Sequence, residues 1–243
     1  MPLKAVFFDF NGVIINDEPI HQTLIEQILV EENLRPNPAD FRDVCLGRSD
    51  RACFRDLFSR RGRVATDAYL DTIIQRKSSL YQEQLETLNP LPIYPGVEDF
   101  IYQLRTAHLP IGLVSGALRQ EIEIVLQRSN LLSVFSTLVA GDDIRASKPE
   151  PDGYLLALEH LKDQLQDTTL KPEDCLVIED TPAGIEAAKR AGMAVVGVAN
   201  SYPFHMMQRQ ANWTVDYLTE LELERIRCVF QGTGERELAA QVS

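Results

Sequence analysis

The chain has no long apolar segment, since no stretch of its 243 residues approaches the ~20 apolar residues of a membrane-spanning helix. It also has no basic region ahead of its first apolar run, so we expect neither a secretory signal nor membrane insertion. Cysteine is scarce, and no two cysteines form a CxxC pair; the four are Cys45, Cys53, Cys175 and Cys228. A chain of this length needs no disulfides, so we expect unpaired cysteines and a reducing, cytoplasmic location.

Positive charge is also in short supply. Lysine and arginine number 24 against 36 acidic residues, which gives a net charge of −12. The electrostatic field of this net negative charge repels nucleic acid backbones and anionic membranes, so we expect neither as a partner. Any bound phosphate must be held by groups in its immediate surroundings. No exposed apolar stripe stands out either, and we expect a monomer or a weak homodimer.

Several common catalytic motifs are missing. No GxGxxG follows a predicted strand, no GxxxxGK[ST] occurs, and the surroundings of Ser115 do not match GxSxG. The four histidines lack the spacing of metal ligands, which favours solvated or core roles over a zinc site; they are His21, His108, His160 and His205. These absences argue against a dinucleotide-binding enzyme, a P-loop protein and a serine hydrolase.

What the sequence does contain is an alternation of strands and helices. The predicted strands are short apolar runs at residues 5–8, 111–114, 137–140, 176–178 and 194–198. Helical patterns lie between them at residues 97–106, 118–129, 153–165 and 183–191. Strands that alternate with helices pair in parallel through right-handed crossovers. We therefore predict an α/β fold with a doubly wound, Rossmann-like parallel sheet.

The alternation stops after the first strand. Residues 17–93 carry three amphipathic helical patterns, at 19–32, 51–61 and 66–88, and no convincing strand. This stretch is too long for a crossover and too regular for a loop, so we predict an inserted helical domain that covers the carboxyl ends of the strands as a lid. The predicted core domain then comprises residues 1–16 and 94–231, and residues 232–243 form a loosely ordered tail.

Polar side chains end the predicted strands. Asp9, Ser115 and the pair Glu179 and Asp180 follow three of them, and Lys148 lies in the loop after a fourth. Because parallel strands carry their carboxyl ends to one edge of the sheet, we expect these groups to converge. Carboxylates with few basic neighbours suit Mg²⁺, and a lysine and a hydroxyl beside it would bind a transferring phosphoryl group. The reaction indicated is attack by Asp9 on phosphorus to give an aspartyl-phosphate.

Each of these residues has an ordinary structural role as an alternative. Asp9 alone could be a turn residue, and Ser115 could cap the next helix. Lys148 alone could be a solvated lysine, and Asp180 could form a helix N-cap before a proline. Only the combination is specific to phosphoryl chemistry.

The combination resembles the haloacid dehalogenase superfamily, in the branch of β-phosphoglucomutase and related phosphatases with a helical cap. The resemblance runs from Leu3 to about Val198. It is carried by the family's four motifs in order, which are Asp9-Phe10-Asn11-Gly12-Val13, Val114-Ser115-Gly116, Ser147-Lys148-Pro149-Glu150-Pro151 with Tyr154, and Val177-Ile178-Glu179-Asp180-Thr181-Pro182-Ala183-Gly184.

The resemblance implies an Mg²⁺-dependent phosphohydrolase or phosphomutase that acts on a small-molecule phosphate ester. It implies that Asp9 is the nucleophile and that Asp180, Asp9 and the main-chain carbonyl of Asn11 hold the metal. Glu179 would support the metal's water shell, and the phosphate-binding residues would be Ser115, Gly116 and Lys148.

Three residues of the predicted cap are candidates for substrate contacts. Arg48, Arg51 and Lys77 are placed over the substrate by the resemblance. Their alternative role is a solvated helix face, and Arg51 could simply pair with its neighbour Asp50.

Asn11 departs from the family pattern. Most phosphotransferases of this family carry a second aspartate there, whose acid–base assistance contributes about 10² to 10⁴ in rate. An amide cannot supply it, although the backbone carbonyl remains for the metal. The first hypothesis is a phosphatase with slowed turnover, and the second is a nearly inactive relative that binds a phosphorylated metabolite. A phosphomutase is disfavoured because it needs proton transfer in both half-reactions. A dehalogenase is disfavoured because it would have no reason to keep Glu179 and Asp180 as metal-supporting acids.

Overall fold

A computed structural model describes residues 2–231, and its centre is a parallel sheet. Within this part of the chain the sheet has six strands in the order β3-β2-β1-β4-β5-β6, and every neighbouring pair is parallel. The strands are β1 (Ala5–Phe8), β2 (Ile111–Val114), β3 (Thr137–Val139), β4 (Cys175–Glu179), β5 (Ala194–Val198) and β6 (Trp213–Val215). This arrangement confirms the predicted doubly wound α/β fold.

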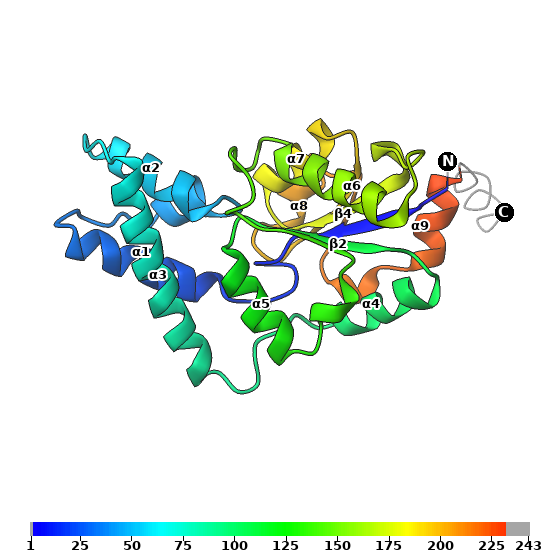
Figure 1. Cartoon of the computed structure of the whole chain (residues 1–243), viewed down its shortest axis with the longest axis horizontal. Helices are drawn as coiled ribbons and strands as arrows, with labels where there is room; N and C mark the ends of the chain where they lie inside the picture. Colours follow the sequence, from blue (N-terminus) through cyan, green and yellow to red (C-terminus); the bar gives the residue numbers. More distant parts are fainter. Residues whose placement is uncertain (1, 232–243) are drawn as a thin grey trace.

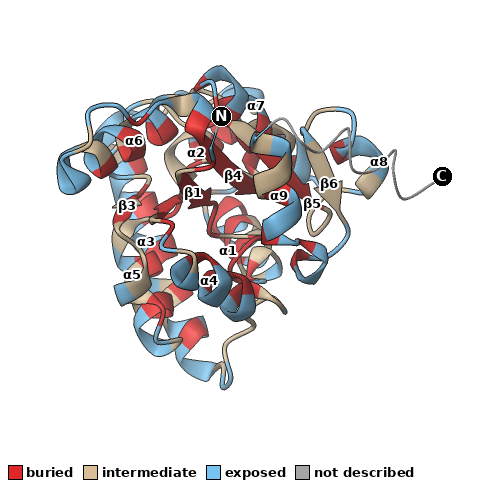
Figure 2. Ribbon diagram, turned by 90° about the vertical axis from the view of Figure 1, so that its right-hand side faces the viewer, coloured by how far each residue is buried: buried red, intermediate tan, exposed pale blue. Residues whose placement is uncertain are grey.

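Helices cover both faces of the sheet (Figure 1). One face packs against α4 (Val97–Thr106), α5 (Arg119–Arg128) and α9 (Leu223–Phe230), and the other against α6 (Asp152–Leu165), α7 (Pro182–Arg190) and α8 (Phe204–Met207). Short turns of 3₁₀ helix occur at Leu132–Val134, Pro172–Asp174 and Leu218–Glu220. Figure 2 shows that the strands at the centre are buried, because apolar side chains from both layers enclose them.

A group of helices stands apart from the sheet, beyond the carboxyl ends of the strands (Figure 1). It consists of α1 (Glu18–Glu31), a π-helical turn (Phe41–Cys45), α2 (Asp50–Arg60) and α3 (Asp67–Thr87), and we call it the helical insert. The insert has an apolar core of its own, built around Phe54, Phe58 and Ile28. Whether it folds as a separate domain, with boundaries at residues 17 and 93, stays a prediction.

Local sequence explains where several helices begin. The side chains of Ser49, Thr66 and Thr181 accept hydrogen bonds from backbone N–H groups in the first turns of α2, α3 and α7. Such capping satisfies amide groups that the helix itself leaves unpaired. Pro182 at the first position of α7 adds a residue that has no N–H to satisfy.

The insert is closed onto the core. The Ser49 N–H donates to Ser147 Oγ at 2.7 Å, and the Arg128 guanidinium donates to the carbonyls of Leu85 and Leu88 at 2.6 Å each. These bonds join the loop before α2 and the end of α3 to the sheet domain, so the insert contacts the core at both places.

None of the helices in residues 2–231 combines the length and the apolar character that crossing a membrane requires.

The expectation of unpaired cysteines was wrong. Cys45 and Cys53 form a disulfide with their Cα atoms 4.6 Å apart. The π-helical turn ends at Cys45 and α2 carries Cys53, and the short loop between these two helices brings the cysteines together. Nothing in the sequence indicated this disulfide, because the two cysteines lack a CxxC spacing. The cysteines therefore give no support to a reducing, cytoplasmic location. The predicted loose tail, residues 232–243, lies outside the described residues.

Candidate active site

The site lies at the carboxyl ends of the two central strands. β1 and β4 are neighbours, and the chain leaves β1 toward one side of the sheet and later crosses to β4 on the other side. Ligands of open α/β sheets bind at such a switch point. Asp9 directly follows β1, while Glu179 ends β4 and Asp180 follows it. The fold alone therefore brings three carboxylates together.

Lys148 joins two of these carboxylates. Its Nζ donates to Asp9 Oδ1 and to Glu179 Oε1, each at 2.6 Å, and all three side chains are buried. Tyr154 in α6 donates its hydroxyl to the same Glu179 oxygen at 2.8 Å. Burial alone would lower the pKa of Lys148, but the two acids raise it above its usual value, so the lysine stays charged.

The second oxygen of Glu179 is also occupied. Oε2 accepts hydrogen bonds from the backbone N–H of Asp180 at 3.1 Å and of Thr181 at 3.3 Å. It also accepts one from the Thr181 hydroxyl at 3.2 Å. Both oxygens of Glu179 are thus engaged, and its carboxylate fixes Lys148 and the loop after β4.

One carboxylate oxygen of Asp180 accepts no hydrogen bond from the described residues. Its Oδ2 accepts from the Ser201 hydroxyl, but Oδ1 is buried and finds no hydrogen-bond partner within residues 2–231. Burial and the neighbouring charge of Asp9 raise the pKa of Asp180 well above its usual value. Burial, followed by repulsion from Glu179, raises the pKa of Asp9 to about 7 despite its contact with Lys148. The raised pKa values of Asp9 and Asp180 show that Lys148 alone does not balance the negative charge gathered here.

The geometry suits a divalent cation. Ligand oxygens from Asp9, Glu179 and Asp180 lie within 4.8 Å of one another. Gly12 borders the same space with a φ of +78°, and a Cβ there would come within 1.9 Å of Asp180 Oδ2. Oxygen-rich, carboxylate-based sites bind hard cations such as Mg²⁺ or Ca²⁺. The orphaned oxygen of Asp180 and the cradle at Gly12 both fit such an ion.

The loop after β2 approaches the same point. Ser115 Oγ accepts from the Ala117 N–H at 3.0 Å and donates to Asn11 Oδ1 at 3.4 Å. At Gly116 a Cβ would lie 2.8 Å from the backbone nitrogen of Ser49. Glycine is required there because the loop before α2 packs directly against this turn.

A second carboxylate stands behind Asn11. Asn11 Nδ2 donates to the two oxygens of Asp17 at 3.1 and 3.0 Å, and Tyr81 donates its hydroxyl to Asp17 as well. His21 stacks on Tyr81 with ring centroids 4.6 Å apart, and its Nε2 lies 3.3 Å from Asp17 Oδ2. Burial alone would raise the pKa of Asp17, but these partners, His21 first, hold it below its usual range.

Sequence reasoning missed this network. His21 was expected in a solvated or core role, and it is buried as a core residue would be, but it also lines the cavity described next. The spacing of Asp17 and His21, four residues apart at the start of α1, was the available signal. Tyr81 carries no such signal, because only the packing of α3 on α1 brings its hydroxyl to Asp17.

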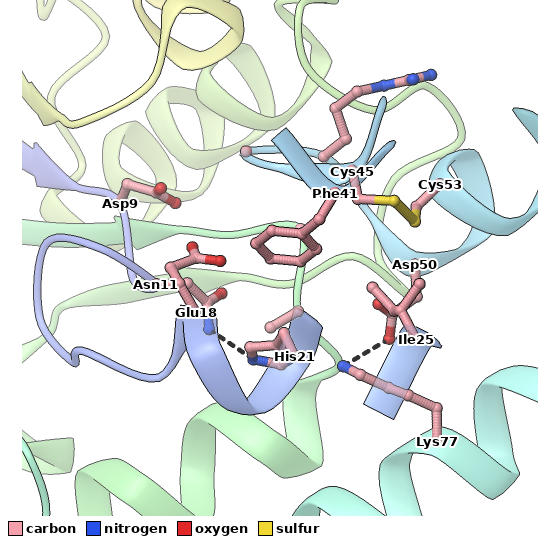
Figure 3. Close-up of a pocket in the computed structure, with 14 residues that line it drawn as sticks. Asp9, Asn11, Glu18, His21, Ile25, Phe41, Cys45, Asp50, Cys53 and Lys77 are labelled. Atoms are coloured by element: carbon pink, nitrogen blue, oxygen red, sulfur yellow. Dashed lines mark hydrogen bonds and ion pairs between the residues drawn. A yellow bond between two sulfur atoms is a disulfide. The ribbon is translucent and has the colours of Figure 1, made fainter. Parts of the chain in front are cut away.

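A cavity of about 490 Å³, part of which is open to solvent, lies between the insert and the core. Asp9 and Asn11 border one end, and the ion pair of Lys77 and Asp50 borders the other (Figure 3). Glu18 also lines it, and burial raises the pKa of Glu18 to about 8.

Of the three cap residues selected from the sequence, two reach this cavity. Arg48 and Lys77 are among its lining residues. Arg51 is not among them, since its side chain is 40% exposed and pairs with Asp71 and, at 3.6 Å, with Asp67. The suggested pairing of Arg51 with the adjacent Asp50 is not formed, because Asp50 Oδ2 lies 2.9 Å from the Lys77 ammonium instead.

Comparisons with known proteins agree with the fold. Residues 6–198 match the Haloacid dehalogenase-like hydrolase family. The chain is 29% identical to a β-phosphoglucomutase of Bacillus subtilis (strain 168) over 221 residues, which are 90% of this chain and 93% of that protein. It is 30% identical over 199 residues to (DL)-glycerol-3-phosphatase 2 of Arabidopsis thaliana, covering 81% of this chain and 79% of that one.

Solved structures show the same fold. A β-phosphoglucomutase from Clostridium difficile superposes with a TM-score of 0.80 and 21% identity, covering 98% of this chain and 99% of that one. The family match spans most of the chain and includes the strand ends that carry Asp9, Ser115, Lys148 and Asp180. The chain therefore belongs to the haloacid dehalogenase-like hydrolases.

Proposed function

We propose that this protein is an Mg²⁺-dependent phosphatase that hydrolyses a small phosphate ester through an aspartyl-phosphate on Asp9. The observation that carries the proposal is the group of three buried carboxylates with one lysine and one orphaned oxygen, on Asp180. An arrangement of this kind needs a divalent cation to complete it and leaves room beside Asp9 for a dianionic phosphoryl group. The relatives that are phosphatases and phosphomutases support the proposal.

Each residue has a distinct part in the proposed reaction. A carboxylate oxygen of Asp9 forms a bond to phosphorus while the ester P–O bond breaks, and the alcohol oxygen leaves as an anion that takes a proton from water. Water then cleaves the aspartyl-phosphate and regenerates the carboxylate. Lys148 and the Ser115 hydroxyl, together with the backbone at Gly116, bind the phosphoryl oxygens and hold them in line with Asp9.

The proposed cation ligands are the side chains of Asp9 and Asp180 and the main-chain carbonyl of Asn11. Glu179 would support them through the water shell, although its own oxygens are engaged with Lys148, Tyr154 and the loop after β4. When bound, Mg²⁺ supplies positive charge that stabilises the phosphoryl oxygens in the transition state.

Asn11 limits the proposed rate. Its amide has no proton to give at neutral pH, and its N–H group is already committed to Asp17. We therefore propose slow turnover, fastest with esters whose alcohols are good leaving groups. The alternative function, a protein that binds a phosphorylated metabolite with little or no turnover, is favoured by the same residue.

One assay separates these functions. Phosphate release with Mg²⁺ is measured on a panel of alkyl, sugar and aryl phosphates for the unaltered protein and for Asp9→Ala. The third variant is the exchanged pair Asn11→Asp/Asp17→Asn, because Asn11→Asp alone would press one buried carboxylate against another. We expect slow release by the unaltered protein, none by Asp9→Ala, and release about 10² to 10⁴ faster by the exchanged pair.

The outcomes point in different directions. Release by the exchanged pair alone, with none by the unaltered protein on any ester, would favour the binding protein over the phosphatase. Metal-independent halide release from a haloacid would contradict both.

A further inference from the structure

The end of the cavity farthest from Asp9 holds a charge cluster, which we call the distal cluster (Asp50, Lys77 and Glu121). The resemblance places Lys77 over the substrate, but neither the sequence motifs nor the family match assigns the two acids. Lys77 Nζ lies 2.9 Å from Asp50 Oδ2 and 3.5 Å from Glu121 Oε1. Asp50 begins α2 and Lys77 lies in α3, both in the insert, whereas Glu121 lies in α5 of the core. The side chains of Lys77 and Glu121 are 1% and 0% exposed. The cluster therefore forms only when the insert is closed, and it carries one excess negative charge.

The carboxylates of the distal cluster are short of hydrogen-bond donors. Neither oxygen of Glu121 accepts a hydrogen bond from any residue in the described range 2–231, and within that range the partner of Asp50 Oδ2 is the Lys77 ammonium at 2.9 Å. Leaving a buried acceptor unsatisfied is costly, and native structures rarely do so without a ligand or water in the gap. Asp50 borders the cavity directly, so donors brought by a ligand can reach it.

The cations at this end of the cavity are already neutralised. Burial alone would lower the pKa of Lys77, but Asp50 and Glu121 raise it, so the ammonium is charged and shared between two acids. Arg48 Nη1 donates to Asp56 Oδ2 at 2.8 Å and to the Val44 carbonyl at 2.9 Å. Among the described residues that line the cavity, Lys77, Arg48 and His21 thus each have an acidic partner, while the buried Nε of Arg48 donates to no acceptor.

A second anionic group on the substrate would meet net repulsion at this end. One excess negative charge about 6 Å away, at an effective dielectric constant of about 20, weakens binding of an anion roughly a hundredfold. Hydroxyl groups, in contrast, can donate to Asp50 and accept from Lys77, both of which line the cavity. Carboxylate acceptors beside one ammonium donor suit a ligand that carries several hydroxyl groups, because each hydroxyl can both donate and accept a hydrogen bond.

We propose that the cavity selects phosphate monoesters of uncharged polyhydroxylated alcohols, and that Asp50 and Glu121 reject substrates with a second phosphate or a carboxylate at the far end. This inference rests on the proposed phosphatase function and adds the substrate class. The specificity-determining residue that a ligand contacts directly is Asp50.

The test uses pairs of esters that differ at one end only. Glycerol phosphate is compared with phosphoglycerate, and sorbitol phosphate with phosphogluconate, all with the phosphate on a terminal carbon. The measured quantity is kcat/KM for phosphate release with Mg²⁺ by the unaltered protein, Asp50→Asn and Glu121→Gln. Asp71→Asn is the matched control, because Asp71 pairs with Arg51 outside the cavity.

We expect the unaltered protein to prefer the polyol ester of each pair by at least about tenfold, within the range that one buried charge supplies. Asp50→Asn should reduce that preference by about tenfold or more, mainly through faster reaction of the acid-bearing ester. Glu121→Gln should act in the same direction and serves if Asp50→Asn fails to fold. Asp71→Asn should leave the ratio unchanged.

Binding provides a second readout that needs no turnover. The shift in melting temperature caused by each ester in the presence of Mg²⁺ should be larger for the polyol member of each pair. Equal or better reaction and binding of the acid-bearing esters, or a ratio that Asp50→Asn and Glu121→Gln leave unchanged, would overturn the inference while phosphate release kept the proposed function intact. Failure of the proposed function would instead show as no release from any ester.

Discussion

Replacing Lys148 by methionine tests whether one lysine balances the buried carboxylates. Its Nζ is 2.6 Å from both Asp9 Oδ1 and Glu179 Oε1, and the lysine, Asp9 and Glu179 are 5%, 4% and 0% exposed. Removing one partner of a buried ion pair costs roughly 3 to 5 kcal/mol. For a chain of this size each kcal/mol lowers the melting temperature by about 2 to 4 °C, so we expect a loss of roughly 6 to 20 °C near pH 8.

The loss should depend on pH in a defined direction. Burial already raises the pKa of Asp9 to about 7 in the folded protein, and removing Lys148 raises it further. A carboxyl group whose pKa is raised by folding destabilises the folded state once the pH exceeds the unfolded value, and the penalty grows up to the folded pKa. The difference in stability between the unaltered protein and Lys148→Met should therefore be largest near pH 8 and shrink toward pH 5.

The measurement is thermal unfolding in EDTA at several pH values, repeated with Mg²⁺. The double variant Lys148→Met/Glu179→Gln is the matched control, because it removes the uncompensated acid together with the lysine and should recover part of the loss. Addition of Mg²⁺ should also recover part of it. A melting temperature for Lys148→Met within about 2 °C of the unaltered protein at pH 8 would refute the reasoning.

Three further predictions follow from the site and the insert. Asn11→Asp alone should melt about 6 to 12 °C below the exchanged pair Asn11→Asp/Asp17→Asn, because two buried carboxylates about 5 Å apart repel by roughly 3 kcal/mol at an effective dielectric constant of about 20; equal melting in calorimetry would contradict this. Cys45→Ser should lower the free energy of unfolding by about 2.5 kcal/mol in a denaturant titration, because the disulfide that it breaks joins two cysteines with a sequence separation of 8. Modification of both thiols by a thiol reagent in the unaltered, unreduced protein would show that the disulfide does not exist. The rise in melting temperature caused by Mg²⁺ should be larger at pH 8 than at pH 5.5, because protons compete for the carboxylates of Asp9 and its neighbours, whose pKa values are raised without the metal; a pH-independent rise would argue against carboxylate ligands.

The sequence predicted the core of the fold because its strands are buried on both sides. The runs at 5–8, 111–114 and 194–198 coincide with β1, β2 and β5, since continuous apolar residues are needed wherever helices cover both faces. The edge strand β6 was missed. Its three residues, Trp213–Val215, are only half-buried and pair on one side, so they show no apolar run.

The grouping at the strand ends was also predictable. Parallel strands carry their carboxyl ends to one edge, and that rule alone places Asp9 beside Glu179 and Asp180. The structure adds what no spacing shows, namely that Lys148 bridges Asp9 and Glu179 and that Asp180 keeps one oxygen without a partner.

The far end of the cavity could not be predicted from patterns. Asp50, Lys77 and Glu121 come from α2, α3 and α5, and their meeting depends on how the insert packs on the core. Arg51 illustrates the same limit, because one position along α2 separates Asp50 in the cavity wall from a side chain that pairs on the surface. Helix rotation sets which side chain faces inward, and that rotation depends on how α2 packs against the rest of the protein.

The most direct test of phosphoryl chemistry is to look for the covalent intermediate. The protein is mixed with Mg²⁺ and an aryl phosphate, quenched in acid within the first turnover, and analysed by intact and peptide mass spectrometry. The account predicts the added mass of one phosphoryl group on the peptide that contains Asp9, absent from Asp9→Ala. Phosphate release that proceeds with no such adduct on the unaltered protein, or an adduct that persists in Asp9→Ala, would contradict it.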